Sequence, residues 1–270
     1  MLVPAARTCF LMALFALGAV GGWAQNPTLG KSQPLTTAAW LSLAGDARIA
    51  DHWGTHAEAQ WRQAKGVGAA HQNLLRLGLT YHATAALQLT AGYGLLLTAA
   101  QRDAPGTVAL PEHRLYEQLV INDSQNRLQL QHRYRLEQRW VQLAEQTAPT
   151  YLNRIRYQLR LTYPLSGPTL KPGGAYAVAA DELFLGFGRH VEHGIFDQNR
   201  AYAALGYQVL KSLAVEVGYQ NQLAPPNSAA TFGSTHSVQL GLQFSPDFRP
   251  AALLTTTQEA GAKEASTRKN

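Results

Sequence analysis

Polar or charged side chains occur at every second position from Arg127 to Arg139, within the stretch 127–141. The odd positions carry polar or charged residues, among them Arg133, Arg135, Glu137 and Arg139, whereas the even positions carry mainly leucine, histidine, tyrosine and tryptophan. A period of two is typical of a β-strand with one polar and one apolar face. Guanidinium and carboxylate groups on one face can form charge-assisted hydrogen bonds, and they can attract anions where arginine is in excess.

Residues 151–163 repeat this pattern and place Arg154, Arg156 and Arg160 on one face. If the two stretches are adjacent strands, their arginines share one interior. The charged residues that we predict to line it are Glu58, Arg133, Arg135, Glu137, Arg139, Arg154, Arg156, Arg160, Glu182, Arg200 and Glu216. We assign no catalytic residue to this set.

Alternating stretches recur along most of the chain, and they predict strands at residues 40–49, 55–63, 73–82, 86–98, 113–121, 127–141, 151–163, 176–187, 199–210, 213–220 and 235–244. For residues 113–121 the pattern does not show which side chains point inward and which point outward. Single-chain bacterial barrels have an even number of strands, so we expect that one stretch is missed, merged or misassigned. The fold class is therefore all-β, an antiparallel transmembrane β-barrel of about 10–12 strands.

Two features favour a membrane barrel over a soluble β-sandwich or barrel, which would also alternate. Aromatic residues such as Trp61, Tyr81, Trp140 and Tyr163 lie at strand ends on the apolar face, where the girdles of membrane barrels occur. The lysines fall in predicted turns or tails, at Lys31, Lys65, Lys171, Lys211, Lys263 and Lys269. Solvent-exposed sheets normally use lysine freely, so the sequence predicts lipid as the surroundings.

The N-terminus resembles a secretory signal, because Arg7 precedes the apolar residues 9–20 and small residues precede a cleavage point after Ala24. This apolar run is shorter than the roughly 20 residues of an uncleaved membrane helix. We predict a signal peptide at residues 1–24, a periplasmic lead-in at 25–37, the outer-membrane β-barrel at 38–245 and a disordered tail at 246–270. The single cysteine, Cys9, lies in the signal, and we predict no cofactor and no metal site.

The formal net charge of +6 is dispersed along the strands, which argues against nucleic acid binding. We expect a monomer in the outer membrane with no assigned function. Its interior is either a structural Arg/Glu network or a narrow anion-preferring pore, in the manner of a porin for small anionic solutes. The criterion that separates these two interpretations is whether every inward arginine has a carboxylate within reach.

A third interpretation is an outer-membrane lipid hydrolase that uses a lipid-facing histidine. His132 and Asn153 have outward parity on neighbouring predicted strands. Such chemistry needs a nucleophile beside the base, and no serine in the predicted strands has clear outward parity. We therefore predict that the protein is not an enzyme.

Five blocks of the chain are similar to a known family. They are HRYRLEQRW at residues 132–140, RIRYQLRLTYPL at 154–165, DELF at 181–184, DQNRAYAALGYQ at 197–208 and VEVGYQNQL at 215–223. With this spacing, residues 40–244 resemble the bacterial outer-membrane family called domain of unknown function 2490. The resemblance implies an outer-membrane β-barrel and no established activity.

Overall fold

The structure, a computed structural model, describes residues 36–64, 71–99, 110–142, 146–189, 195–225 and 233–249. The predicted signal peptide, most of the predicted lead-in and residues 250–270 of the predicted tail lie outside these ranges. Every element of regular secondary structure in the described ranges is a β-strand. The described residues contain no helix of the length and apolarity that a membrane span requires.

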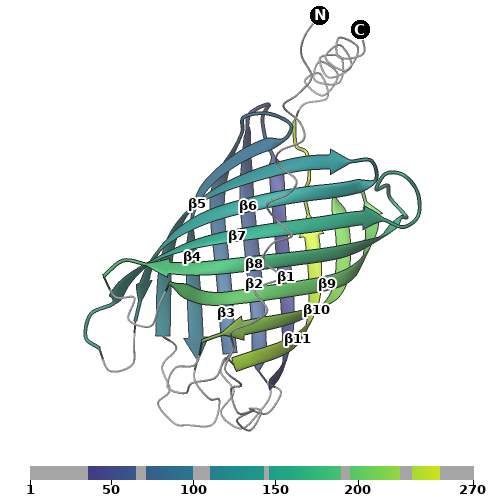
Figure 1. Cartoon of the computed structure of the whole chain (residues 1–270). Helices are drawn as coiled ribbons and strands as arrows, with labels where there is room; N and C mark the ends of the chain where they lie inside the picture. The colour runs from purple at the N-terminus through teal and green to yellow at the C-terminus, as the bar shows by residue number, and fades with distance from the viewer. Residues whose placement is uncertain are drawn as a thin grey trace, which may run out of the picture. The chain divides into compact units, whose positions relative to one another are not determined.

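Eleven strands follow one another along the chain (Figure 1). They are β1 (Thr36–Arg48), β2 (Trp53–Ala64), β3 (His71–His82), β4 (Leu87–Ala99), β5 (Leu110–Gln125), β6 (Leu128–Val141), β7 (Thr150–Pro164), β8 (Ala175–Phe187), β9 (Phe196–Leu210), β10 (Leu213–Ala224) and β11 (Gly233–Phe244). Each of the eleven stretches that alternate in the sequence forms one of these strands.

The strands close into a barrel in which each strand pairs antiparallel with its sequence neighbour. β1 and β11 complete the circle by parallel pairing, with Trp40 opposite Gln239 and Leu43 opposite Leu242. The prediction of a closed β-barrel is confirmed, but the expectation of a missed or misassigned strand was wrong. With an odd number of alternating strands the first and last run in the same direction, so a parallel pair allows closure.

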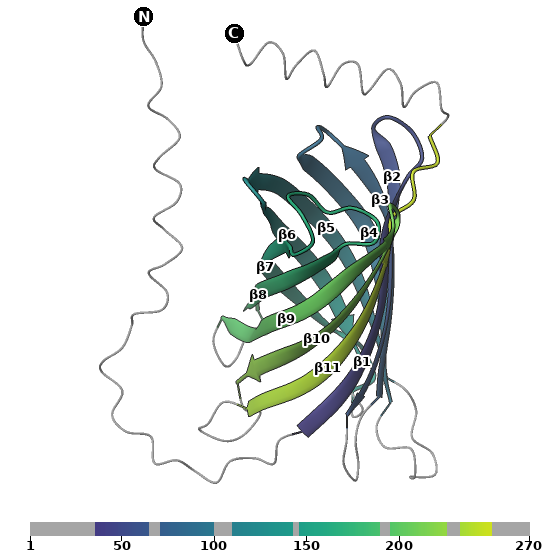
Figure 2. The same cartoon turned by 90° about the vertical axis from the view of Figure 1, so that its right-hand side faces the viewer.

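The connections differ between the two rims of the barrel. At the rim where β1 ends, four connections are short, residues 49–52, 83–86, 126–127 and 211–212, and one, residues 165–174, is longer. We call this the short-connection rim. At the long-connection rim, where β1 begins, they are residues 65–70, 100–109, 142–149, 188–195 and 225–232. In Figure 2 the β1–β2 hairpin lies at the top and the start of β1 at the bottom.

The alternation of side chains separates the two surfaces of the wall. On β6, Tyr134 points outward and is 43% exposed, whereas its neighbour Arg135 points inward and is 1% exposed. Polar and charged residues therefore make up most of the buried centre. A small apolar cluster of Tyr176, Val178 and Ala214 packs at the strand ends near the short-connection rim.

One glycine is required by close packing inside this cluster. Gly206 on β9 lies opposite Tyr176 on β8. A Cβ atom at Gly206 would lie 2.2 Å from Cζ of the Tyr176 ring, so this position has no room for a side chain.

The residues after β11 continue along the end of β1. The backbone N–H of Arg48 donates to the Pro246 carbonyl at 2.9 Å, and the N–H of Phe248 donates to the Arg48 carbonyl at 2.8 Å. The Arg249 side chain hydrogen-bonds Asp247 and so lowers the pKa of that carboxyl group. Residues 246–249, which the sequence assigned to the tail, are thus ordered against the short-connection rim.

Candidate functional site

The structure places the predicted interior residues on the inner face of β2 and β6 to β10, and most of those in the middle of the barrel join one network of ion pairs. Each of these strands contributes alternate positions, so charges from neighbouring strands meet inside the barrel. The order of the network follows from the register between strands, which sets Glu137 opposite Arg154 and Arg135 opposite Arg156.

Glu137 on β6 is the centre of this network and is fully buried, with 0% exposure. Arg154 donates to its Oε2 from Nε at 3.0 Å and from Nη2 at 2.5 Å. Arg156 donates to Oε1 from Nη1 at 2.8 Å, and Arg76 donates from Nη2 at 3.4 Å. A buried carboxylate is tolerated only when it is paired and hydrogen-bonded, and three guanidinium groups supply that here.

Two further carboxylates extend the network across the lumen. Glu182 on β8 accepts from Arg156 Nη2 at 2.7 Å and from Arg133 Nη2 at 2.8 Å. Glu58 on β2 accepts from Arg76 Nη1 at 2.7 Å. Arg76 and Arg156 each bridge two carboxylates, so β2, β3, β6, β7 and β8 are joined by one chain of ion pairs.

Each end of the lumen has its own carboxylate. Towards the long-connection rim, Glu112 accepts from Arg114 Nε at 2.6 Å and from Arg139 Nε at 2.5 Å. Towards the short-connection rim, Glu216 accepts from Arg160. Charged pairs therefore occupy the lumen along most of its length.

Two aromatic rings separate the arginines in the middle of the barrel. The guanidinium carbon of Arg62 lies 3.9 Å from the ring centroid of Trp40 on β1, and the guanidinium carbon of Arg200 lies 5.2 Å from the same centroid. Phe184 on β8, with 0% exposure, has Arg200 at 4.7 Å and Arg156 at 4.4 Å from its ring centroid. Arginine over an aromatic face is attracted by the ring quadrupole. These five side chains form a partition, which we call the septum.

A cavity lies on each side of the septum, and Trp40, Arg156, Arg200 and Gln220 line both cavities. The cavity on the short-connection side has a volume of about 280 Å³ and is lined by four arginines and four acidic residues. The cavity on the long-connection side has a volume of about 420 Å³. We call the second one the arginine chamber. It is lined by seven arginines, Arg62, Arg76, Arg114, Arg139, Arg154, Arg156 and Arg200, but by only two acidic residues among those described, Glu112 and Asp197.

Two arginines of the chamber have no ion-pair partner among the described residues. Arg62 donates to the side-chain oxygens of Gln72, at 3.3 Å, and Gln60. Arg200 donates from Nε to Gln222 Oε1 at 3.1 Å. The criterion from the sequence, a carboxylate for every inward arginine, is therefore not met on this side of the septum.

The sequence analysis did not include several residues that build this region: Trp40, Arg62, Arg76, Glu112 and Arg114. Arg62 and Arg76 have the inward parity of their strands, so the pattern contained the signal. On β5 the pattern was ambiguous because both faces mix polar and apolar residues. Glu112 and Arg114 point inward, whereas Glu117 points outward.

The outward histidine considered from the sequence, His132, lies beside the hydroxyl of Tyr157 at 2.9 Å. Asn153 accepts from the Tyr151 hydroxyl at 2.8 Å and is paired with Gln138, so it is not a neighbour of His132. The expectation that no serine of the predicted strands faces outward did not cover the full length of β11. Ser234 on β11 is exposed on the outer wall, one residue before the start of the predicted strand.

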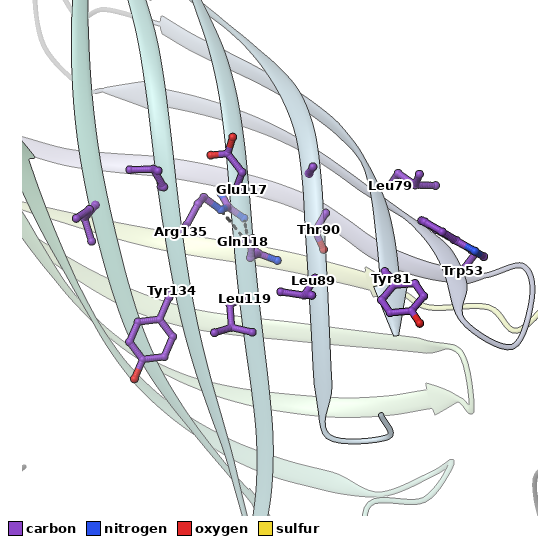
Figure 3. A pocket seen from close by; sticks show the side chains of 13 residues that line it. Trp53, Leu79, Tyr81, Leu89, Thr90, Glu117, Gln118, Leu119, Tyr134 and Arg135 are labelled. Carbon is purple, nitrogen blue, oxygen red and sulfur yellow. Dashed lines mark hydrogen bonds between the residues drawn. The ribbon is translucent and has the colours of Figure 1, made fainter. Parts of the chain in front are cut away.

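The outer wall also carries a shallow apolar hollow of about 670 Å³ over β2 to β7. Figure 3 shows Trp53, Leu79 and Tyr81 on one side and Tyr134 on the other, with Leu89 and Leu119 between them. Glu117 is the acidic residue on its lining, and it accepts a hydrogen bond from Gln138 Nε2 at 3.2 Å.

Comparison with known families shows which family this chain matches. Residues 37–232 match the family described as "Protein of unknown function (DUF2490)". The search of curated proteins and the search of solved structures each found no match. The match covers most of the chain and most of the barrel, so the resemblance seen in the sequence blocks is confirmed. The chain therefore belongs to the DUF2490 family.

Proposed function

We propose that this protein is an outer-membrane β-barrel with a closed lumen, and that it binds small anions in the arginine chamber instead of conducting them. The membrane part of the proposal rests on the outer wall. Large apolar side chains are exposed on it in rows, for example Leu75, Leu77 and Leu79, which are 51%, 58% and 53% exposed. Exposed apolar surface of this extent, around a charged interior, is the inverse of a soluble protein and is typical of a transmembrane barrel.

The lengths of the connections support one orientation. Bacterial barrels have short periplasmic turns and longer extracellular loops. In this orientation the long-connection rim and the arginine chamber face outward, and the ordered residues 246–249 lie at the periplasmic rim. The periplasmic lead-in expected at residues 25–37 would require the opposite orientation.

The observation that carries the binding proposal is that two of the seven arginines around the arginine chamber, Arg62 and Arg200, have no carboxylate partner among the described residues. Guanidinium groups recognise carboxylate and phosphate oxygens through two parallel hydrogen bonds. A ligand that carries two or more such groups would neutralise arginines that are unpaired within the described chain. The septum disfavours a conduit, because its members Trp40, Arg156 and Arg200 line both cavities and so lie between them.

The test combines conductance with binding on one refolded preparation. We expect the protein to float with lipid vesicles and to give no discrete openings in planar bilayers. We expect pyrophosphate to bind in isothermal titration calorimetry. The double variant Arg62→Gln with Arg200→Gln should weaken this binding by about 100-fold or more, since each charge-assisted contact is worth about 10-fold or more.

The matched control is Arg133→Gln, which removes one charge from the short-connection cavity. Its carboxylate partner, Glu182, keeps Arg156 as a second partner. This control should leave pyrophosphate binding within about twofold of the parent. Anion-selective openings in the unmodified protein would overturn the closed lumen, and equal losses in the two variants would overturn the chamber as the binding site.

A further inference from the structure

The outer wall carries a serine, a histidine and an asparagine within hydrogen-bond reach of one another. Ser234 and His236 lie two residues apart on β11, so their side chains share the outward face. Asn221 on β10 lies directly opposite His236. The Ser234 Oγ and His236 Nε2 atoms are 3.4 Å apart. The Asn221 Nδ2 atom lies 2.8 Å from Ser234 Oγ and 3.2 Å from His236 Nδ1.

Tyr219, two residues before Asn221, completes the group. Its hydroxyl hydrogen-bonds His236 Nδ1, and its ring stacks on the imidazole with centroids 5.8 Å apart. A histidine can accept a proton at Nε2 only if Nδ1 carries the other proton. The Tyr219 oxygen can accept the hydrogen bond from Nδ1–H and so hold this tautomer. The arrangement has the three parts of acyl-transfer chemistry: a nucleophile, a base and a group that orients the base.

We propose that Ser234, His236 and Asn221 form a hydrolytic site for carboxylic esters of membrane amphiphiles. Ser234 Oγ attacks the ester carbonyl carbon while its proton passes to His236 Nε2. The carbon–oxygen bond to the alcohol then breaks, and the alcohol oxygen takes the proton from Nε2. Water attacks the acyl group on Ser234, gives one proton to Nε2 and releases the carboxylic acid, and the proton returns to Oγ. The Asn221 amide, which points at Oγ, is placed to donate to the oxygen that becomes negative.

The position of the site in the barrel suggests the substrate class. Ser234 is the second residue of β11 and Asn221 is near the end of β10, so the site lies near the long-connection rim. Further along the same wall, Val217 and Val238 are each 57% exposed and Leu240 is 43% exposed. An ester at the rim would have its acyl chain along these apolar residues. This choice of substrate rests on the proposed membrane placement, but the serine chemistry does not.

The test is active-site labelling of refolded full-length protein in detergent micelles. A fluorophosphonate probe should label Ser234, as identified by mass spectrometry, and p-nitrophenyl butyrate should be hydrolysed. Ser234→Ala should abolish both signals. His236→Gln should reduce both by at least about 100-fold, which is the usual contribution of a general base.

Two matched controls separate this site from general effects of substitution. Ser237→Ala changes a serine on the same strand that points inward and is 5% exposed. His132→Ala removes an outward histidine whose hydrogen bond is to Tyr157. Both should keep full labelling and hydrolysis, and the heat-modifiable gel mobility of a folded barrel verifies folding of every variant. Absence of labelling in folded parent protein, or labelling that survives in Ser234→Ala, would overturn the proposal. Flotation and conductance are measured separately, so failure here leaves the proposed function intact.

Discussion

The strongest test of the interior network is the neutralisation of its central carboxylate by Glu137→Gln. The two oxygens of Glu137 accept from Arg154 on one side and from Arg156 and Arg76 on the other. Glutamine has nearly the same shape but keeps only one acceptor oxygen. If that oxygen faces Arg154, the amide NH₂ group faces Arg156 and Arg76, and both hydrogen bonds are lost.

The magnitude follows from the number of bonds lost. A hydrogen bond to a charged group contributes about 1.5–3 kcal/mol, so the loss of two gives about 3–6 kcal/mol. Removal of one partner from a buried ion pair typically costs about 3–5 kcal/mol, because the remaining charges stay buried. We expect the free energy of unfolding of Glu137→Gln to fall by about 3–5 kcal/mol. The assay is urea unfolding of the barrel in phospholipid vesicles, followed by tryptophan fluorescence.

The control is the same chemical change on the opposite face of the adjacent strand. Glu117 on β5 points outward and accepts one hydrogen bond from Gln138. A carboxylate that faces hydrocarbon is unfavourable, so Glu117→Gln should leave the free energy of unfolding unchanged or raise it. A loss of unfolding free energy below about 1 kcal/mol in Glu137→Gln would refute the paired interior. An equal loss in the two variants would refute the apolar surroundings of the outer wall.

Three further outcomes are expected. Arg62→Gln with Arg200→Gln should change the unfolding free energy without ligand by less than about 1 kcal/mol in urea titrations, because neither arginine leaves an unpaired carboxylate. Gly206→Ala should lose about 1–3 kcal/mol through the clash with Tyr176, and the loss should shrink when Tyr176→Leu is added, as a double-mutant cycle would measure. Trp40→Ala, which removes the ring between Arg62 and Arg200, should produce discrete anion-selective openings in planar bilayers. Continued silence there would mean that this ring does not close the lumen.

Local alternation was sufficient to predict the strands, because each residue of a strand faces the side opposite to its neighbour. The stretch at residues 151–163 and the observed β7 differ by one residue at each end. Alternation failed to settle β5, where Tyr116 and Val120 point inward and Glu117 points outward. A polar residue on the outer wall and an aromatic residue inside give both faces the same mixed composition.

Contacts between strands that are distant in the sequence could not be predicted from any local sequence pattern. The ion pair from Arg76 to Glu137 joins residues 61 positions apart. The septum needs Trp40 from β1, Arg62 from β2 and Arg200 from β9 at one height. Such coincidences depend on the stagger between strands and on how the barrel closes. Ser234 was missed for a simpler reason. β11 begins at Gly233, whereas the predicted strand begins at Thr235.

The sequence by itself determined that this chain forms β-strands with one charged and one apolar face, because residue spacing alone decides which side chains share a face. It also determined that arginine and glutamate would meet inside. Only the tertiary structure decided that an odd number of strands closes through a parallel β1–β11 pair, and that the arginine excess lies on one side of a septum. It alone brought Ser234, His236 and Asn221 together on the outer wall. These features depend on register and closure, which are set by the packing of the whole barrel.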